Sequence, residues 1–139
     1  MLAVALAGFV GLPLGEQRQP GSLEVEARLT SPGAATPTAA VRVTETGIGR
    51  VVAVESENLA PLDNDQEFYE LWFVGPGDTQ AEPNRVSAGT FHPDEQGRTD
   101  VRLAVAAVPD DYPVLSVTRE PRDGNPGSSG AEVLRSRTE

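Results

Sequence analysis

The chain of 139 residues contains no cysteine, and only 11 of its side chains are Lys or Arg, against 21 Asp or Glu. Without cysteine there is no disulfide framework, no thiolate metal site and no thiol redox centre. The formal net charge of -10 argues against nucleic acid as a partner and disfavours direct contact with anionic membranes. The length corresponds to about one domain, which can bury a core without disulfides.

A long hydrophobic run is also missing. Residues 1–14 are apolar and uncharged, but as a helix they would extend only about 21 Å, against a hydrocarbon core of about 30 Å. No positive region precedes them, as a signal peptide requires. Three interpretations stay open: the end of a membrane helix that begins upstream, a signal anchor, or a short packed strand. The polar Pro/Gly segment 15–21 that follows favours the first two and reads as a linker.

Helical periodicity is absent from the rest of the chain, residues 22–139, where apolar and polar residues alternate with a period of two. Turn signals separate the alternating stretches at fairly even intervals. This pattern predicts an all-β fold, an antiparallel sandwich or a barrel, and we expect an immunoglobulin-like β-sandwich of about eight short strands. The expected strands are residues 23–30, 39–44, 50–57, 68–74, 86–91, 98–106, 114–120 and 131–135.

Few side chains suit catalysis or metal binding. His92 is the single histidine, and it directly precedes Pro93 in an expected turn, so an exposed turn residue is favoured over a general base acting on Ser87. Asp63, Asp65 and Glu67 alternate as Ca²⁺ ligands can, but the glycine and glutamate of an EF-hand loop are missing at the required positions. We therefore expect no catalytic residue, no cofactor and no metal site.

The single tryptophan, Trp72, has two interpretations. With Tyr69 and Phe73 it could form a face on which a ligand stacks, but aromatic residues at strand spacing more often pack in a core. We expect Trp72 to be a core residue.

Three motifs follow one another in the second half of the chain. They read as a Tyr-x-Leu-Trp strand, a Ser-Ala-Gly-x-Phe-x-Pro-Asp-x-x-Gly hairpin, and a Ser-x-x-x-Glu-Pro segment with Gly and Pro after it. Their residues are Tyr69, Leu71 and Trp72; Ser87, Ala88, Gly89, Phe91, Pro93, Asp94 and Gly97; and Ser116, Glu120, Pro121, Gly124 and Pro126. In order and spacing they resemble the extracytoplasmic C-terminal domain of the anti-sigma-K factor family. Asp123 and Asn58 stand where that family carries glycine.

The resemblance implies a non-enzymatic domain on the outer side of a membrane-tethered regulator. In such proteins a cytoplasmic domain holds a sigma factor, and the outer domain governs the stepwise proteolysis that releases it. The sigma-binding domain does not occur in these residues, so a sigma factor is expected as a partner only through a separate cytoplasmic domain. The partners expected at the outer membrane face are a protease or another regulator.

A second function class stays open beside this regulator. The chain could be a secreted or cell-surface β-sandwich module that binds a small ligand or a carbohydrate. The motifs cannot separate the two classes, because each motif consists of strand and turn residues.

Overall fold

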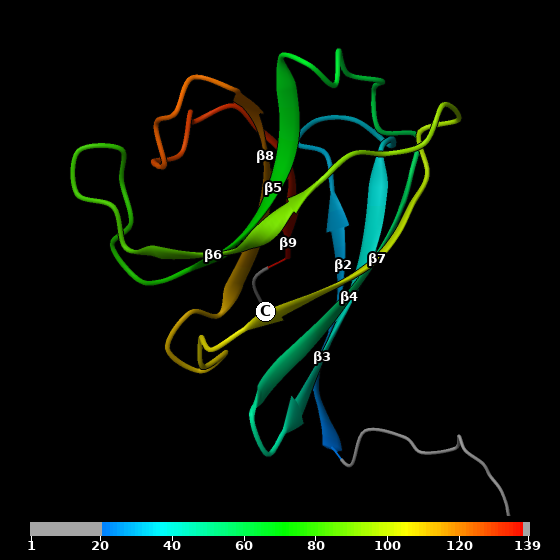
Figure 1. The fold of residues 1–139 in the computed structure, drawn as a ribbon. Coiled ribbons are helices and arrows are strands. Elements are labelled where there is room, and N and C mark those ends of the chain that lie inside the picture. Colours follow the sequence, from blue (N-terminus) through cyan, green and yellow to red (C-terminus); the bar gives the residue numbers. More distant parts are fainter. Residues whose placement is uncertain (1–20, 138–139) are drawn as a thin grey trace, which may run out of the picture.

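The computed structural model describes residues 21–137, which contain eight antiparallel strands and no helix. The strands are β2 (Gly21–Thr30), β3 (Thr38–Thr46), β4 (Gly49–Glu57), β5 (Glu67–Val74), β6 (Arg85–Phe91), β7 (Thr99–Val105), β8 (Val114–Pro121) and β9 (Glu132–Ser136). Figure 1 shows how they curve around a common interior. The predicted all-β antiparallel class and the predicted number of strands are therefore confirmed.

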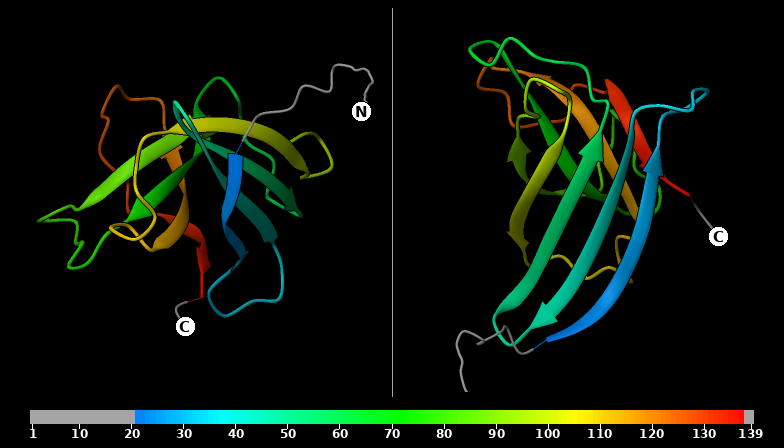
Figure 2. Two further views of the ribbon diagram at one scale, coloured as in Figure 1. Left: turned by 90° about the horizontal axis from the view of Figure 1, so that it is seen from below. Right: turned by 90° about the vertical axis from the view of Figure 1, so that its right-hand side faces the viewer.

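All eight strands belong to one sheet, in the order β6-β5-β8-β9-β2-β3-β4-β7. Its halves, β6-β5-β8-β9 and β2-β3-β4-β7, are joined by only two residue pairs, Leu29 with Ser136 and Thr30 with Arg135. The two end strands, β6 and β7, contact each other, so the sheet is nearly closed (Figure 2). The expected immunoglobulin-like sandwich of two separate sheets is not confirmed, because one hydrogen-bonded sheet curves around the core instead.

The core consists of the apolar residues that alternate with polar ones along the strands. In β3 and β4, Val41 pairs with Val54 and Val43 with Val52, and all four side chains are fully buried. Tyr69, Leu71 and Phe73 of β5 point into the same cluster from the other half of the sheet. Tyr69 stacks on Phe91, and its hydroxyl donates to the carbonyl of Ala60 at 2.8 Å. Burial of such side chains is the main stabilising contribution to the fold.

A β-bulge at Ala88 closes the sheet. Leu71 pairs with Gly89 but Trp72 pairs with Ser87, which leaves Ala88 as an extra residue in β6. Bulges increase local twist and bend a strand. Gly89 has φ 132°, and a Cβ there would lie 3.1 Å from Leu103 Cδ2 of β7. The Ser-Ala-Gly motif therefore brings β6 against β7.

No helix in residues 21–137 is long and apolar enough to cross a membrane. The expected apolar segment 1–14 and most of the expected linker 15–21 lie outside the described residues.

Candidate functional site

Trp72 lies on the outer side of β5, where two long loops cover it. Its neighbours Leu71 and Phe73 face the main core, so alternation directs the indole away from that core. The residue is nevertheless only 4% exposed. Its Nε1 donates to Thr118 Oγ1 of β8 at 2.8 Å, and the Arg85 guanidinium lies 5.3 Å from the ring centroid. The tryptophan is therefore buried, as expected, but beneath the loops 75–84 and 122–131, outside the main core cluster.

A buried carboxylate holds the second of these loops. Glu120 is 3% exposed, and it accepts hydrogen bonds from the Thr118 hydroxyl, the Ser129 amide and the Ser129 hydroxyl. The amide bond is 3.0 Å long. A buried charged oxygen needs several donors to offset its lost hydration, and these groups supply them. The carboxylate thus ties the loop at Ser129 to the end of β8.

An ion pair holds the first loop. Arg85 Nη2 lies 2.6 Å from Asp78 Oδ2, and the two side chains are only 12% and 9% exposed. Hydrogen bonding from Arg85, with a further bond from the Asn84 amide, lowers the pKa of Asp78 below its ordinary value. Such charge-assisted bonds are the stronger kind of hydrogen bond.

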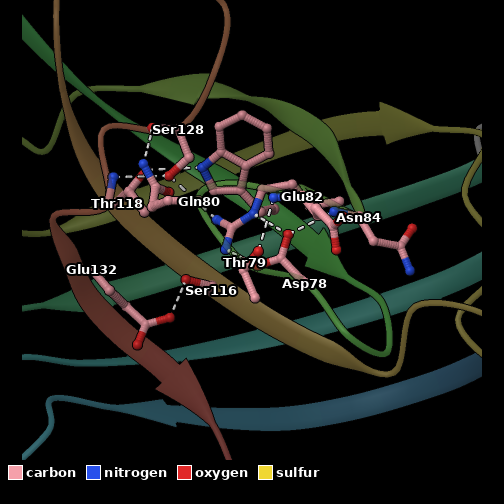
Figure 3. Close-up of polar contacts among 12 residues, drawn as sticks. Asp78, Thr79, Gln80, Glu82, Asn84, Ser116, Thr118, Ser128 and Glu132 are labelled. Atoms are coloured by element: carbon pink, nitrogen blue, oxygen red, sulfur yellow. Dashed lines mark hydrogen bonds and ion pairs between the residues drawn. The ribbon is translucent and has the colours of Figure 1, made fainter.

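The two loops also contact each other. Gln80 Nε2 donates to the Ser128 carbonyl at 3.1 Å, and Arg85 Nη1 donates to the Ser128 hydroxyl at 3.4 Å. Figure 3 shows Gln80 and Ser128 beside Thr118, with the Ser116 to Glu132 bond below them. We call this group the loop cluster; it consists of Trp72, Asp78, Gln80, Arg85, Thr118, Glu120, Ser128 and Ser129.

A small hollow of about 210 Å³ beside the loop cluster is polar. The charged side chains that line it are paired, Asp78 with Arg85 and Glu132 with Arg135. Because each charge already has a partner, this arrangement favours a structural role for the cluster, which holds two loops on the sheet.

The candidate Ser87–His92 pair is not brought together as a nucleophile and its base. The Ser87 hydroxyl donates to Glu70 Oε2, whereas His92 Nε2 lies 3.2 Å from the Glu67 carbonyl and 3.5 Å from Arg122 Nη2. Burial is the main cause that raises the pKa of Glu70. His92 is half-buried rather than exposed as predicted, because the start of β5 and the loop after β8 pack against the turn that contains it.

The acidic turn uses its carboxylates for folding. Asp63 Oδ1 accepts the amide of Asp65 at 3.2 Å, and Glu67 forms a two-point pair with Arg119 at 2.7 and 2.8 Å. That pairing lowers the pKa of Glu67. Within residues 21–137 there is no group of three His, Cys, Asp or Glu side chains placed to hold a metal ion.

A hollow of about 590 Å³ lies at the end of the sheet that holds the turn 94–97. Its charged lining is mixed: the basic side chains are Arg28 and Arg98, and the acidic ones are Glu55, Glu57, Asp94 and Asp100. Arg98 and Asp94 are paired across 3.4 Å. This open, mixed-charge groove does not define a class of ligand.

The motif residues build strands, turns and the bulge. Asp94 Oδ1 accepts the amides of Gln96 and Arg98 at 2.9 Å, and Gly97 has φ 79°. A Cβ at Gly97 would lie 2.6 Å from the Leu59 carbonyl oxygen. Asn58, where the family pattern has glycine, also has a positive φ of 64°, a conformation that asparagine tolerates.

Sequence reasoning missed the partners in the loop cluster. Glu120 was singled out by its motif, but its contacts with Thr118 and Ser129, and the pairing of Asp78 with Arg85, were not foreseen. One signal was available: Glu120 is a charged residue on the same face of β8 as the apolar-flanked Thr118 and Ser116, all three buried.

The fold and these contacts define an all-β antiparallel domain whose motif residues lie in strands, turns and the bulge. The chain belongs to the family described as "Anti-sigma-K factor rskA, C-terminal", whose family model matches residues 1–132. No curated protein and no solved structure matches the chain in the same comparisons. The chain is thus the C-terminal domain of an anti-sigma factor, in a family that is regulatory and not typically enzymatic.

Proposed function

We propose that this chain is the extracytoplasmic regulatory domain of a membrane-tethered anti-sigma factor, and that it controls release of a sigma factor through regulated proteolysis. The observation that carries the proposal is the family match, which covers residues 1–132 and therefore includes the apolar segment 1–14. On this proposal that segment belongs to the membrane anchor, residues 15–21 to the linker and residues 22–139 to the outer domain.

The structure supports a domain that limits access by proteases. Proteases cleave peptide bonds in extended, accessible backbone, and a folded sheet must open before its strands can be cut. Here the two longest loops are tied down by the Asp78–Arg85 pair and by Glu120. Opening of this sheet is then the event that a signal or a partner would control.

The proposed partners are proteins. A protease or another regulator contacts the domain at the outer face of the membrane, and the sigma factor is held by a separate cytoplasmic domain. The strongly acidic composition, with a net charge of -10, fits protein contacts and not nucleic acid.

The test is a fusion in a bacterial membrane, in which a cytoplasmic reporter transcription factor and an added apolar segment precede the full chain; the added segment extends residues 1–14 to membrane-spanning length. The released reporter is measured for the unchanged chain and for Gly97→Val, which opens the hairpin against Leu59. The proposal expects more released reporter from Gly97→Val, and unchanged release from the matched turn variant Glu95→Gln. Equal release from all three, with the domain recovered from the medium, would contradict it and favour a secreted binding module.

A further inference from the structure

Three large apolar side chains stay exposed in residues 21–137, and two of them lie at the same end of the sheet. They are Ile48, 98% exposed, Leu23, 51% exposed, and Val108, 39% exposed. Leu23 pairs with Thr44 close to the turn that carries Ile48, and Val108 follows Val105, which pairs with Arg50. We call Leu23 and Ile48 the apolar patch.

The Ile48 side chain takes no part in the hydrogen bonds of its own turn. The Thr46 hydroxyl donates to the Gly49 carbonyl at 2.7 Å and accepts the Ile48 amide at 3.3 Å, so side chain and backbone of neighbours hold the turn. Turn tips usually carry Gly, Asn, Asp or Ser. A hollow of about 330 Å³ beside Ile48 is lined largely by apolar residues, among them Val51, Ala104 and Ala106. A fully exposed isoleucine beside such a surface suits an apolar partner.

The chain enters the sheet at this same end. Gly21, the first described residue, pairs with Thr46, next to the turn that carries Ile48. Figure 2 shows the start of β2 and the β3–β4 turn together at one end of the molecule. Residues 15–20 can extend at most about 20 Å. If residues 1–14 end a membrane anchor, as proposed above, Gly21 lies within about 20 Å of that anchor, and the apolar patch lies at the same end of the sheet as Gly21.

We propose that this end of the domain rests on the lipid headgroup region, with Ile48 inserted among the headgroups. The inference rests on the proposed membrane tether and adds to it a second, direct contact. Apolar side chains at the tip of a structural element insert readily into this interfacial layer when they lie beside it.

The charges around the patch select the kind of lipid. Glu45 is exposed beside the turn, and Asp110 and Asp111 are exposed beside Val108. The one nearby arginine, Arg50, is paired with Glu24 at 2.7 Å. Because acidic side chains are repelled by an anionic surface, zwitterionic lipids are the expected partner.

The absence of cysteine allows a direct test on the full chain. Ile48→Cys introduces a single thiol for an environment-sensitive fluorophore such as NBD, and Glu95→Cys places the same label on the exposed turn at the other end of the sheet. Both labelled chains are mixed with phosphatidylcholine vesicles and floated on a density gradient. We expect both to float, the label at position 48 to shift its emission to the blue, and the label at position 95 to stay unchanged. Replacing part of the lipid by phosphatidylglycerol should reduce the shift at position 48.

The outcomes separate the two proposals. If the chains float but position 48 behaves like position 95, the lipid contact is overturned and the tether stands. If neither chain floats, the lipid contact is overturned; the tether is then tested by the reporter fusion, because residues 1–14 alone are too short to span the bilayer. If position 48 is already shifted without vesicles, another part of the protein covers the patch, and the lipid contact is overturned.

Discussion

Gly97 closes the turn 94–97 in a conformation that disfavours any residue with a Cβ. Its φ of 79° is costly for residues with a Cβ, and the Cβ itself would lie 2.6 Å from the Leu59 carbonyl oxygen. The left-handed conformation costs about 1–2 kcal/mol, and the close contact adds to it. We expect Gly97→Val to lower the free energy of unfolding by roughly 2 kcal/mol or more in urea denaturation monitored by circular dichroism.

His92→Ala provides the comparison within the same hairpin. It removes the contact of Nε2 with the Glu67 carbonyl, and loss of one such hydrogen bond costs about 1 kcal/mol. The valine variant should therefore be the less stable of the two. Equal losses, or a larger loss for His92→Ala, would show that the turn does not depend on Gly97.

Burial in the folded protein disfavours the ionised form of the Glu70 carboxyl. Burial raises the pKa of its carboxyl, with the Ser87 hydrogen bond acting in the opposite direction and Glu120 adding to the rise. A carboxyl with a raised pKa in the folded state contributes stability below its unfolded pKa, and that stability is lost as pH rises through the folded pKa. At pH 7 the ionised carboxylate is therefore a cost.

Glu70→Gln removes that charge and keeps an oxygen that accepts from Ser87. We expect the variant to have a higher melting temperature than the unchanged chain at pH 7. The difference should shrink as the pH falls below the ordinary glutamate value of 4.5. Glu57→Gln, at an exposed position, removes the same charge from the whole molecule and should not reproduce the effect. A pH-independent gain would contradict the assigned cause.

At the scale of elements, alternation located each strand to within about two residues, because a strand with one buried face fixes its own period. Alternation does not predict the register of the strands or the closure of the sheet. The bulge at Ala88 and the two-pair junction of β2 with β9 depend on which strands meet in space. A local motif signals that a feature exists, as Ser87-Ala88-Gly89 did, but not that it brings β6 against β7.

The contacts of the loop cluster could not be predicted from the sequence for the same reason. Its members come from β5, β6, β8 and two loops, and the bond from Trp72 to Thr118 joins residues 46 positions apart. The composition of the loops, rich in Pro and Gly, predicted surface segments but not the buried carboxylate and ion pair that hold them. Long-range polar contacts of this kind leave no periodic trace in the sequence.

Glu120 should control how firmly the loop after β8 is held. Glu120→Gln keeps an acceptor but loses the charge that receives the Ser129 amide, the Ser129 hydroxyl and the Thr118 hydroxyl, so we expect about 1–3 kcal/mol of destabilisation. Trypsin should then cut after Arg122 faster than in the unchanged chain. Glu95→Gln, in the exposed turn, is the matched control. An unchanged rate of cleavage at Arg122 would mean that the carboxylate does not hold this loop.

At the scale of the molecule, the nearly closed sheet places two different surfaces at its ends. One end carries the turn 94–97 and a mixed-charge groove, and the other carries the entry of the chain at Gly21 and the apolar patch. On the proposed tether, the first end lies toward soluble partners and the second toward the anchor. We therefore propose that a protease separates the domain from the anchor within the segment before Gly21.

Limited proteolysis of the native chain tests this polarity. Arg18 falls in the proposed linker, whereas Arg28, Arg42 and Arg102 lie in β2, β3 and β7, where cleavage requires the sheet to open. Brief trypsin treatment should release a stable fragment that begins at Gln19, as read by N-terminal sequencing and mass spectrometry. Later trimming should occur at Arg122 and in the C-terminal tail.

For trypsin cleavage at Arg85, the sequence pattern and the structure give opposite predictions. The pattern places it at the end of a Pro/Gly loop and predicts a trypsin site, but in the structure it begins β6 and its guanidinium is paired with Asp78 at 2.6 Å and lies over Trp72. We expect Arg85 to resist under conditions that cut Arg122. The variant Asp78→Asn weakens the pair and should expose Arg85 to cleavage, while Arg18 is cut at an unchanged rate. Rapid cleavage at Arg85 in the unchanged chain would contradict the loop cluster, and protection of Arg18 would contradict the tether, because a packed N-terminal segment would then favour the secreted binding module.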